Sequence, residues 1–419
     1  MKILYLSHIL SIHDYRFLDK LLSNNHDVLL VALDKNEIPE IISDLKDLKT
    51  VLIPRPLPKH NMKYYFSIRS ILLALIHLVF RIIQNSTLLK NYINERTNIL
   101  HHEFKIFYYQ NMLSKIIKDF KPDVLHSGWV QLDGLVAALT GFKPILQMPW
   151  GSDILLNPFT SEKILAQTKF VISNSTHITC DCEEVRKTIL NIIDYDKNKI
   201  TVIPWGIDLS LFDFDRKKQN IIDNIGWSDK RVIISTRQLS KLYGIHFLIM
   251  ALPSIIDEES DARLLILGSG PQEEELKELV SSLELTNYVQ FVGPVPNDKL
   301  AYYLNLAEVY VSISKSDGSS LSLLEAMACG LPLVVSEVPA ICEWVQDGVN
   351  GYVIPKNKVN PISEKILTLY KDTDTASRMG KINLEIANDK ADWEKNYLTL
   401  NKIYEQMLTS ENISDSIKK

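Results

Sequence analysis

Short apolar runs alternate with longer amphipathic or polar segments along most of the chain. The runs that we interpret as strands are 1–7, 28–33, 124–126, 145–147, 170–172 and 200–203 in the first half, then 232–235, 264–267, 289–292, 309–312 and 333–335. Short apolar runs separated by helical segments are typical of parallel strands that are buried on both faces. The pattern therefore predicts doubly wound α/β sheets, covered by helices on each side.

Helical segments are marked by caps and by apolar spacing. Residues 11–14 have the Ser-x-x-acid spacing of a capping box, and the apolar residues that follow repeat with helical period. Pro271 fits the first position of another helix, because three glutamates follow it where the helix dipole favours anions. Near the C-terminus we expect helices around 362–370 and 393–408, with a frayed tail after Ser410.

The apolar pattern stops between residues 209 and 230, where charged residues dominate, and then restarts. We predict an N-terminal, acceptor-side Rossmann-like domain over 1–208 and a linker over 209–230. A second Rossmann-like domain, which binds the nucleotide, follows over 231–390, and 391–419 forms a helix that packs back toward the first domain. Two such domains in tandem face a cleft, and ligands of these sheets bind beyond the carboxyl ends of the strands.

Composition limits the possible functions. The chain has 419 residues, 46% of them hydrophobic and 23% charged, with a net charge of −5. These values exclude a disordered chain, a multi-spanning membrane protein and the overall basic surface of a nucleic-acid-binding protein. The four cysteines show neither zinc-site nor disulfide-framework spacing, and the first apolar run is too short for a secretory signal. We therefore expect a cytoplasmic protein.

Charge is unevenly distributed. Residues 48–94 contain seven Lys and Arg and no Asp or Glu, and they enclose the apolar run 71–80. One interpretation is an interfacial helix, so that 49–90 would contact an anionic membrane at the inner face of the plasma membrane. The other is a buried helix of the first domain with solvated cationic flanks. The run is about half the ~20 residues of a spanning helix.

The segment 312–332 carries the most chemical information: a strand, a loop of small residues and a short helix. Ser319 or Ser320 can cap that helix, and Gly330 can end it. The free backbone N–H groups at its start, together with the helix dipole, favour binding of a diphosphate. Asp317 and Glu325 flank this position, and their carboxylates can accept hydrogen bonds from sugar hydroxyls at ~1.5–3 kcal/mol each.

This segment resembles the retaining glycosyltransferases of the GT-B fold, specifically glycosyltransferase family 4. Seven residues separate Asp317 from Glu325, as in the family's pattern of an acidic residue, seven residues and then Glu-Ala-Met-Ala-x-Gly-x-Pro. The motifs at 203–208, 268–271 and 347–352 extend the likeness over nearly the whole chain. By resemblance, Glu325 holds the donor ribose and Asp317, one methylene shorter than the usual glutamate, touches the transferred sugar. The implied donor-binding residues are Gly268, Gly270, Gly318, Ser319, Ser320, Leu321, Ser322 and Glu325.

Two cations normally neutralise the donor diphosphate in this family. The loop 235–244 is similar to the family's Arg-Leu-x-x-x-Lys-Gly loop, and Arg237 matches its arginine. Tyr243 stands where the lysine is usual, so Lys241 either substitutes for that lysine or is a solvated surface residue. Cations that are already in place stabilise the charge on the departing diphosphate.

The first domain also departs from the family pattern. The family's His-Gly-Ser/Thr-Asp loop is here Trp150-Gly151-Ser152-Asp153, and we assign Trp150, Gly151 and Asp153 to the acceptor side. Trp150 offers an indole N–H and a flat face for a sugar, whereas Asp153 could be an acceptor-site carboxylate or a turn residue. Among the histidines, His13 is the preferred catalytic candidate, because it follows the first strand, and His126 is a weaker one.

These features favour a metal-independent, retaining glycosyltransferase that uses a nucleoside-diphosphate sugar, with UDP favoured over GDP. The expected acceptor is a glycan or a lipid-linked molecule of bacterial surface polysaccharide or glycolipid synthesis. No cofactor is expected beyond this substrate, and no nucleic acid. The alternative is a non-catalytic sugar-nucleotide-binding partner of another transferase. A nicotinamide dehydrogenase is rejected, because residues 7–13 contain no glycine.

Overall fold

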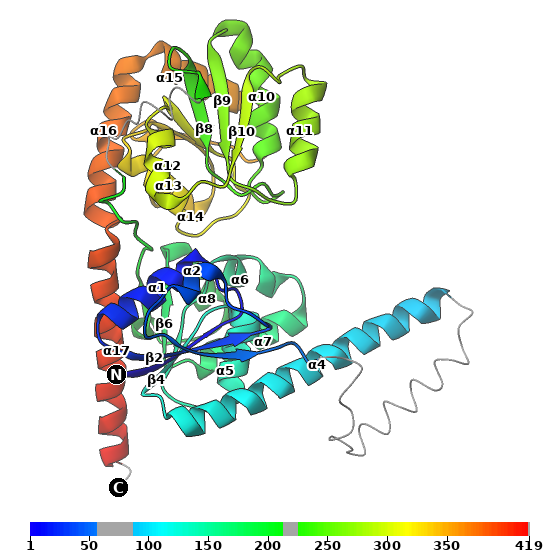
Figure 1. Cartoon of the computed structure of the whole chain (residues 1–419), viewed down its shortest axis with the longest axis vertical. Helices are drawn as coiled ribbons and strands as arrows, with labels where there is room; N and C mark the ends of the chain where they lie inside the picture. Colours follow the sequence, from blue (N-terminus) through cyan, green and yellow to red (C-terminus); the bar gives the residue numbers. More distant parts are fainter. Residues whose placement is uncertain (57–86, 213–224, 418–419) are drawn as a thin grey trace. The chain divides into compact units, whose positions relative to one another are not determined.

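A computed structural model describes residues 1–56, 87–212 and 225–417 (Figure 1). The apolar run 71–80 and most of the predicted linker lie outside these residues. The chain divides into two compact units, which are described separately. The first comprises Met1–Met148, Ser161–Ile178 and Met407–Lys419, and the second comprises Pro149–Thr160 and Thr179–Gln406.

The strands of the N-terminal half form one seven-stranded parallel sheet. Its strands are β1 (Lys2–Ser7), β2 (Asp27–Leu33), β3 (Lys49–Ile53), β4 (Val124–Ser127), β5 (Ile145–Gln147), β6 (His177–Cys180) and β7 (Ile200–Val202). The order across the sheet is β3-β2-β1-β4-β5-β6-β7. Almost every residue of β1 and β2 is buried, as parallel strands covered on both faces require.

Helices and helical turns connect these strands. The α-helices are α1 (Ile12–Ser23), α2 (Glu40–Ser43), α4 (Thr87–Phe120), α5 (Leu135–Leu139), α6 (Ser152–Leu155), α7 (Glu162–Asn174) and α8 (Glu183–Ile192). The shorter turns are a π-helical turn, η2 (Val130–Gly134), and two 3-10 turns, η3 (Asn157–Phe159) and η4 (Lys197–Lys199). The predicted capping box is present: Ser11 accepts from the backbone of His13, and Asp14 accepts from the backbone of Ser11.

The C-terminal half forms a six-stranded parallel sheet with the order β10-β9-β8-β11-β12-β13. Its strands are β8 (Arg231–Ser235), β9 (Ala262–Leu267), β10 (Val289–Gly293), β11 (Val309–Ser312), β12 (Leu333–Ser336) and β13 (Gly351–Ile354). Its helices are α10 (Ile245–Glu258), α11 (Glu273–Ser282), α12 (Asn297–Leu304), α13 (Leu321–Ala328), α14 (Pro339–Cys342), α15 (Asn360–Lys371), α16 (Thr373–Lys390) and α17 (Trp393–Ile417).

Alternate residues of this second sheet enter two different cores. Ile233 on β8 packs with residues of α10 and α15, whereas its neighbours Val232 and Ile234 pack with residues of α12 and α13. Because side chains alternate along a strand, the two clusters lie on opposite faces of the sheet. Helices therefore cover both faces (Figure 1). The predicted doubly wound α/β fold class is confirmed.

Three local predictions were incomplete or wrong. The run 170–172 is not a strand but the end of α7, whose buried Thr168, Val171 and Ile172 follow helical spacing. Pro271 does not start α11, which begins at Glu273 after Gln272. The sequence patterns also gave no separate prediction for α16, an 18-residue helix of mostly polar residues.

Each sheet reverses its strand order once. The first reverses between β1 and β4, and the second reverses between β8 and β11. At such a switch point the loops after the two strands separate to opposite faces, and ligands of open α/β sheets bind there. The loops that follow β1, β4, β8 and β11 are therefore the positions at which to look for chemistry.

Candidate functional site

The switch point of the second sheet holds a buried arginine. Arg237 lies two residues after β8 and is 7% exposed. Its Nη1 donates to the hydroxyls of Ser320 and of Ser322, the latter at 2.6 Å, and its Nη2 lies 2.5 Å from Asp317 Oδ2. Its Nε has no hydrogen-bond partner within the described part of the chain. The structure thus brings three other predicted site residues together around the Arg237 guanidinium.

Arg237 contacts the residue at the start of α13. Ser320 occupies the cap position, but its side chain does not cap the helix. Its hydroxyl accepts from Arg237 instead. The N–H groups of the first turn therefore have no side-chain cap, and with the helix dipole they form a site that favours an anion. Gly330 follows the helix with a φ of +69°, the left-handed conformation predicted for the helix end.

Asp317 is the anionic partner of this cluster. Its Oδ2 lies 2.5 Å from Arg237 and 3.3 Å from the Ser314 hydroxyl. Burial raises the pKa of the Asp317 carboxyl, and the charge of Arg237 and the Ser314 hydrogen bond counteract that rise. Glu325 lies one turn into α13 and is half-buried. The electrostatic neighbours of Arg237 thus include two carboxylates, Asp317 and Glu325.

Tyr243 and Lys241 take different positions on the loop after β8. The guanidinium carbon of Arg237 lies 4.1 Å from the centroid of the Tyr243 ring, which is close enough for a cation–π contact. The side chain of Lys241 is exposed. The tyrosine that replaces the family's lysine therefore contacts the arginine instead of adding a second charge.

Gly268 and Gly270 lie in the loop after β9 and allow it to approach the Arg237 loop. A Cβ on Gly268 would lie 2.8 Å from the Arg237 carbonyl oxygen, and one on Gly270 would lie 2.4 Å from that of Leu239. The Leu239 backbone N–H donates to Ser269 at 3.0 Å across this contact. These glycines act here through close backbone packing.

Asp181 anchors the loop before α13, and the sequence analysis missed it. Its Oδ2 accepts from the Ser319 backbone at 2.6 Å, its carbonyl accepts from the Ser319 hydroxyl at 2.6 Å, and its Oδ1 is buried without a partner in the described chain. A Cβ on Gly318 would lie 2.2 Å from Asp181 Oδ2. Burial raises the pKa of Asp181 to about 6, while the Ser319 N–H opposes the rise. The only sequence signal was its position directly after an apolar strand.

The loop 150–153 lies against the same segment. Gly151 has a φ of +103°, and a Cβ there would be 3.6 Å from the Gly318 backbone nitrogen. Asp153 is fully buried, and its Oδ1 accepts from the Trp150 backbone at 2.8 Å. The Trp150 ring is half-buried and meets the Trp205 ring edge-on at 5.5 Å. Of the two interpretations of Asp153, the structure shows the turn-stabilising contact.

The histidine candidates lie in the first unit. His13 is not in the loop after β1 but in the first turn of α1, where burial and Arg16 lower its pKa to about 4. His126 is fully buried at the end of β4, beside the Tyr5 ring, and burial lowers its pKa to about 3. Both imidazoles are therefore neutral at physiological pH.

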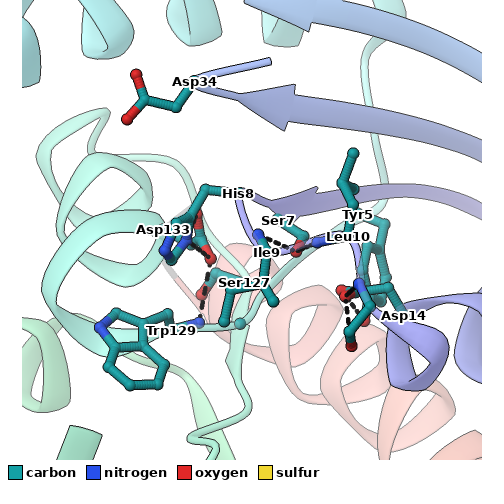
Figure 2. Close-up of polar contacts among 12 residues, drawn as sticks. Tyr5, Ser7, His8, Ile9, Leu10, Asp14, Asp34, Ser127, Trp129 and Asp133 are labelled. Atoms are coloured by element: carbon teal, nitrogen blue, oxygen red, sulfur yellow. Dashed lines mark hydrogen bonds and ion pairs between the residues drawn. The ribbon is translucent and has the colours of Figure 1, made fainter. Parts of the chain in front are cut away.

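A different histidine, His8, lies directly after β1 and pairs with Asp133 (Figure 2). Its Nδ1 lies 3.1 and 3.0 Å from the two carboxylate oxygens. Burial alone would lower the pKa of His8, but Asp133 outweighs that effect and raises it. His8 was not among the candidates predicted from the sequence, although its position directly after the first strand is a signal that could have indicated it.

Two further observations apply to the described residues. They contain no group of three or more His, Cys, Asp and Glu residues arranged to hold a metal ion. Within the same residues, no helix combines the length and the hydropathy needed to span a membrane.

Comparisons with solved structures agree with the fold. HepE of Anabaena, in a crystal structure with UDP, has a TM-score of 0.73 and 16% identity over 97% of this chain and 100% of that one. Sucrose-phosphate synthase of Thermosynechococcus elongatus has a TM-score of 0.75 and 17% identity over 98% of this chain and 100% of that one. With the two doubly wound sheets, these likenesses define the fold as GT-B.

Sequence comparisons give the family. Residues 217–385 match the model for glycosyl transferases group 1, and residues 82–182 match that for glycosyl transferase 4-like proteins. Both matches are to glycosyltransferase families, and the match to group 1 includes every strand of the second sheet.

Two relatives illustrate the range of this family. An uncharacterized glycosyltransferase of Methanocaldococcus jannaschii is 28% identical over 70% of this chain and 78% of that protein. The GDP-mannose-dependent alpha-(1-6)-phosphatidylinositol monomannoside mannosyltransferase of Mycolicibacterium smegmatis is 29% identical over 46% of this chain and 52% of that protein.

Proposed function

We propose that this glycosyltransferase moves a sugar from a nucleoside-diphosphate sugar to a glycan or lipid-linked acceptor, with retention of the anomeric configuration. The observation that carries the proposal is the buried Arg237 at the uncapped start of α13, beside Asp317. A guanidinium and a helix N-terminus that converge on one point suit a diphosphate. The neighbouring carboxylate suits the hydroxyls of the sugar attached to it.

The proposed chemistry is front-face transfer. The bond between the anomeric carbon and the diphosphate oxygen breaks, and the acceptor oxygen forms its bond to the same carbon from the same face. The acceptor proton passes to the departing diphosphate. Arg237 and the first-turn amides of α13 stabilise the charge that develops on that diphosphate, and they do so more in the transition state than in the ground state.

The donor is proposed to carry UDP. In favour of this base, HepE of Anabaena has been solved with UDP and also with UDP-glucose. The name of the Mycolicibacterium relative points instead to GDP-mannose. A thermal-shift panel of UDP, GDP and ADP with their sugars separates these possibilities, because a ligand that binds only the folded state raises the melting temperature.

The acceptor is proposed to be a glycan or a lipid-linked glycan of bacterial surface polysaccharide or glycolipid synthesis. The support is the phosphatidylinositol mannoside in the name of one relative, together with the cationic segment 48–94 of the sequence. No divalent metal is proposed to take part. Incubation with the donor and membrane lipid extract in excess EDTA should therefore still release nucleoside diphosphate.

Arg237→Ala tests the site itself. Loss of a charge-assisted contact worth ~1.5–3 kcal/mol should weaken nucleoside-diphosphate binding by ~10- to 100-fold in calorimetry. Arg378→Ala is the matched control, because Arg378 is exposed on α16. Equal affinity in wild type and Arg237→Ala would refute the donor site.

The non-catalytic alternative has one specific observation in its favour, namely Tyr243 in place of the family's lysine. A partner subunit would bind the nucleotide sugar but release no nucleoside diphosphate with any acceptor. Binding together with release in the EDTA assay excludes this alternative, whereas binding without release supports it.

A further inference from the structure

The two switch points of this chain carry comparable pairs of residues. In the second sheet, Arg237 after β8 meets Asp317 after β11. In the first sheet, His8 after β1 meets Asp133 after β4. The Arg237–Asp317 pair belongs to the proposed donor site, whereas the His8–Asp133 pair has no role in that site. Its position is the one at which an open α/β sheet binds a ligand of its own.

The geometry of the pair fixes the state of the imidazole. Asp133 is fully buried, and besides His8 it accepts from the Trp129 backbone at 3.1 Å. Because the carboxylate faces Nδ1, that nitrogen carries the hydrogen, and Nε2 of the neutral ring is left as an acceptor. His8 Nε2 makes no hydrogen bond to any described residue. The His8 side chain is 25% exposed, against 1% for Asp133.

The backbone on both sides of the pair is irregular. After β1, Leu10 adopts a φ of +55°, and the Ser7 hydroxyl accepts from the backbone of Ile9 at 3.3 Å. After β4, Asp133 sits in the π-helical turn η2. Irregular backbone of these kinds is costly, and in proteins it gathers at functional sites. His8 differs in exposure from His126, which is fully buried and whose surroundings suit a structural role.

The surroundings favour an uncharged polar ligand. Asp34, which lies directly after β2 (Figure 2), accepts from both Lys105 and Tyr109, so the nearby lysine is already paired. The carboxylates of Asp133 and Asp34 would repel an anion. A ligand rich in hydroxyls could donate hydrogen bonds to acceptors here. The Trp129 ring meets the His8 ring edge-on at 6.3 Å and is half-buried, which leaves an aromatic surface for a sugar.

We propose that the His8–Asp133 pair binds a hydroxyl of the sugar portion of the acceptor. His8 Nε2 accepts the hydrogen bond from that hydroxyl, Asp133 holds the ring in the required tautomer, and Trp129 packs beside the sugar. This inference rests on the proposed function, because it assigns the acceptor of the same transfer reaction. The reacting proton still passes to the diphosphate, so His8 binds and orients the acceptor.

The test uses the full chain and octyl glucoside below its micellar concentration, as a probe with sugar hydroxyls. Because Asp133 raises the His8 pKa, the ring nitrogens of His8 are followed by 15N NMR at a pH above the His8 titration, which a pH series of the same spectra locates. We expect the probe to shift His8 Nε2 and to leave His102, which is exposed on α4, unchanged. If the His8 Nε2 resonance does not shift with the probe in a protein that still binds UDP, this inference alone is overturned. Failure to bind any nucleotide overturns the proposed function.

Two variants separate the atoms of the ring. His8→Gln places an amide oxygen near the position of Nε2, whereas His8→Asn replaces only the Nδ1 side. In the transfer assay with membrane lipid extract, His8→Asn should raise the apparent acceptor KM by ~10-fold, as expected for one lost hydrogen bond, and His8→Gln should raise it less. UDP affinity should not change in either variant. Equal KM values in both variants and wild type, or a fall in UDP affinity that parallels the rise in KM, would overturn the assignment.

Discussion

At the residue scale, an aromatic ring occupies the position where the resembling family usually has a second cation. Arg237 is held by two serine hydroxyls, by Asp317 and by the face of Tyr243. The burial of Arg237 opposes its charge, but its carboxylate neighbour outweighs that effect and keeps its pKa raised. A fixed, desolvated guanidinium acts more strongly on a bound phosphate than a solvated lysine does.

The Tyr243 ring should therefore matter more than its hydroxyl. Tyr243→Phe keeps the ring over Arg237 and should leave UDP affinity and donor turnover within about twofold of wild type. Tyr243→Leu removes a contact worth ~0.5–2 kcal/mol and should lower kcat/KM for the donor by ~3- to 30-fold. Steady-state nucleotide release measures both variants. An unchanged Tyr243→Leu would show that the ring does not position Arg237.

Glu325 and Asp317, the two carboxylates of the proposed donor site, should affect different quantities, one UDP affinity and the other turnover. Glu325→Ala removes the implied ribose contact and should weaken UDP binding. Asp317→Ala removes a group placed beside the transferred sugar, and it also frees Arg237 Nη2 for phosphate. It should reduce turnover more than affinity. Calorimetry with UDP and single-turnover transfer distinguish these effects, and full activity in both variants would contradict both assignments.

At the element scale, α13 depends on a loop that is anchored from outside. Asp181 accepts from the Ser319 backbone next to the helix cap, and the Ser320 hydroxyl accepts from Arg237. The loop before α13 is therefore fixed by side chains from distant parts of the sequence. Local propensity at 317–322 alone would favour an ordinary serine-capped helix.

The Asp181 carboxyl makes stability depend on pH. Its pKa is about 6 in the folded state, above the ordinary aspartate value of 3.8. Between these two values the folded protein binds the proton and the unfolded chain does not, so stability falls as pH rises from about 4 to about 6. Relative to Asp181→Asn, wild type should lose on the order of 2 kcal/mol between pH 4 and pH 7. Denaturant unfolding at both pH values measures this, and parallel behaviour of the two proteins would contradict the assignment.

At the scale of the whole molecule, charge distribution matters more than net charge. The chain carries −5 overall, yet residues 48–94 hold seven basic and no acidic residues. We predict association with anionic vesicles at low salt, because each basic residue near the surface contributes ~1 kcal/mol, and release at high salt. Flotation with neutral vesicles is the control. Equal recovery on neutral and anionic vesicles, or none on either, would contradict the prediction.

The sequence by itself determined most of the strands and indicated the family. Apolar runs and caps located ten of the strands and the capped start of α1, because burial on both faces leaves a direct trace in composition. The motifs around Asp317 and Glu325 indicated the family that the comparisons show. Residues 170–172 were predicted as a strand although they end the helix 162–174, because a three-residue apolar run fits a strand as well as a buried helix segment.

Only the tertiary structure decided which polar residues meet. His8 pairs with Asp133 across 125 positions, and Asp181 reaches Ser319 across 138. Such contacts depend on strand order, which the spacing of local motifs does not encode. His13, the third residue of the cap motif, was the histidine preferred from the sequence, but it lies in the first turn of α1, whereas His8 follows β1 directly. A residue's neighbours along the chain fix its element, whereas the topology of the sheet fixes its partners.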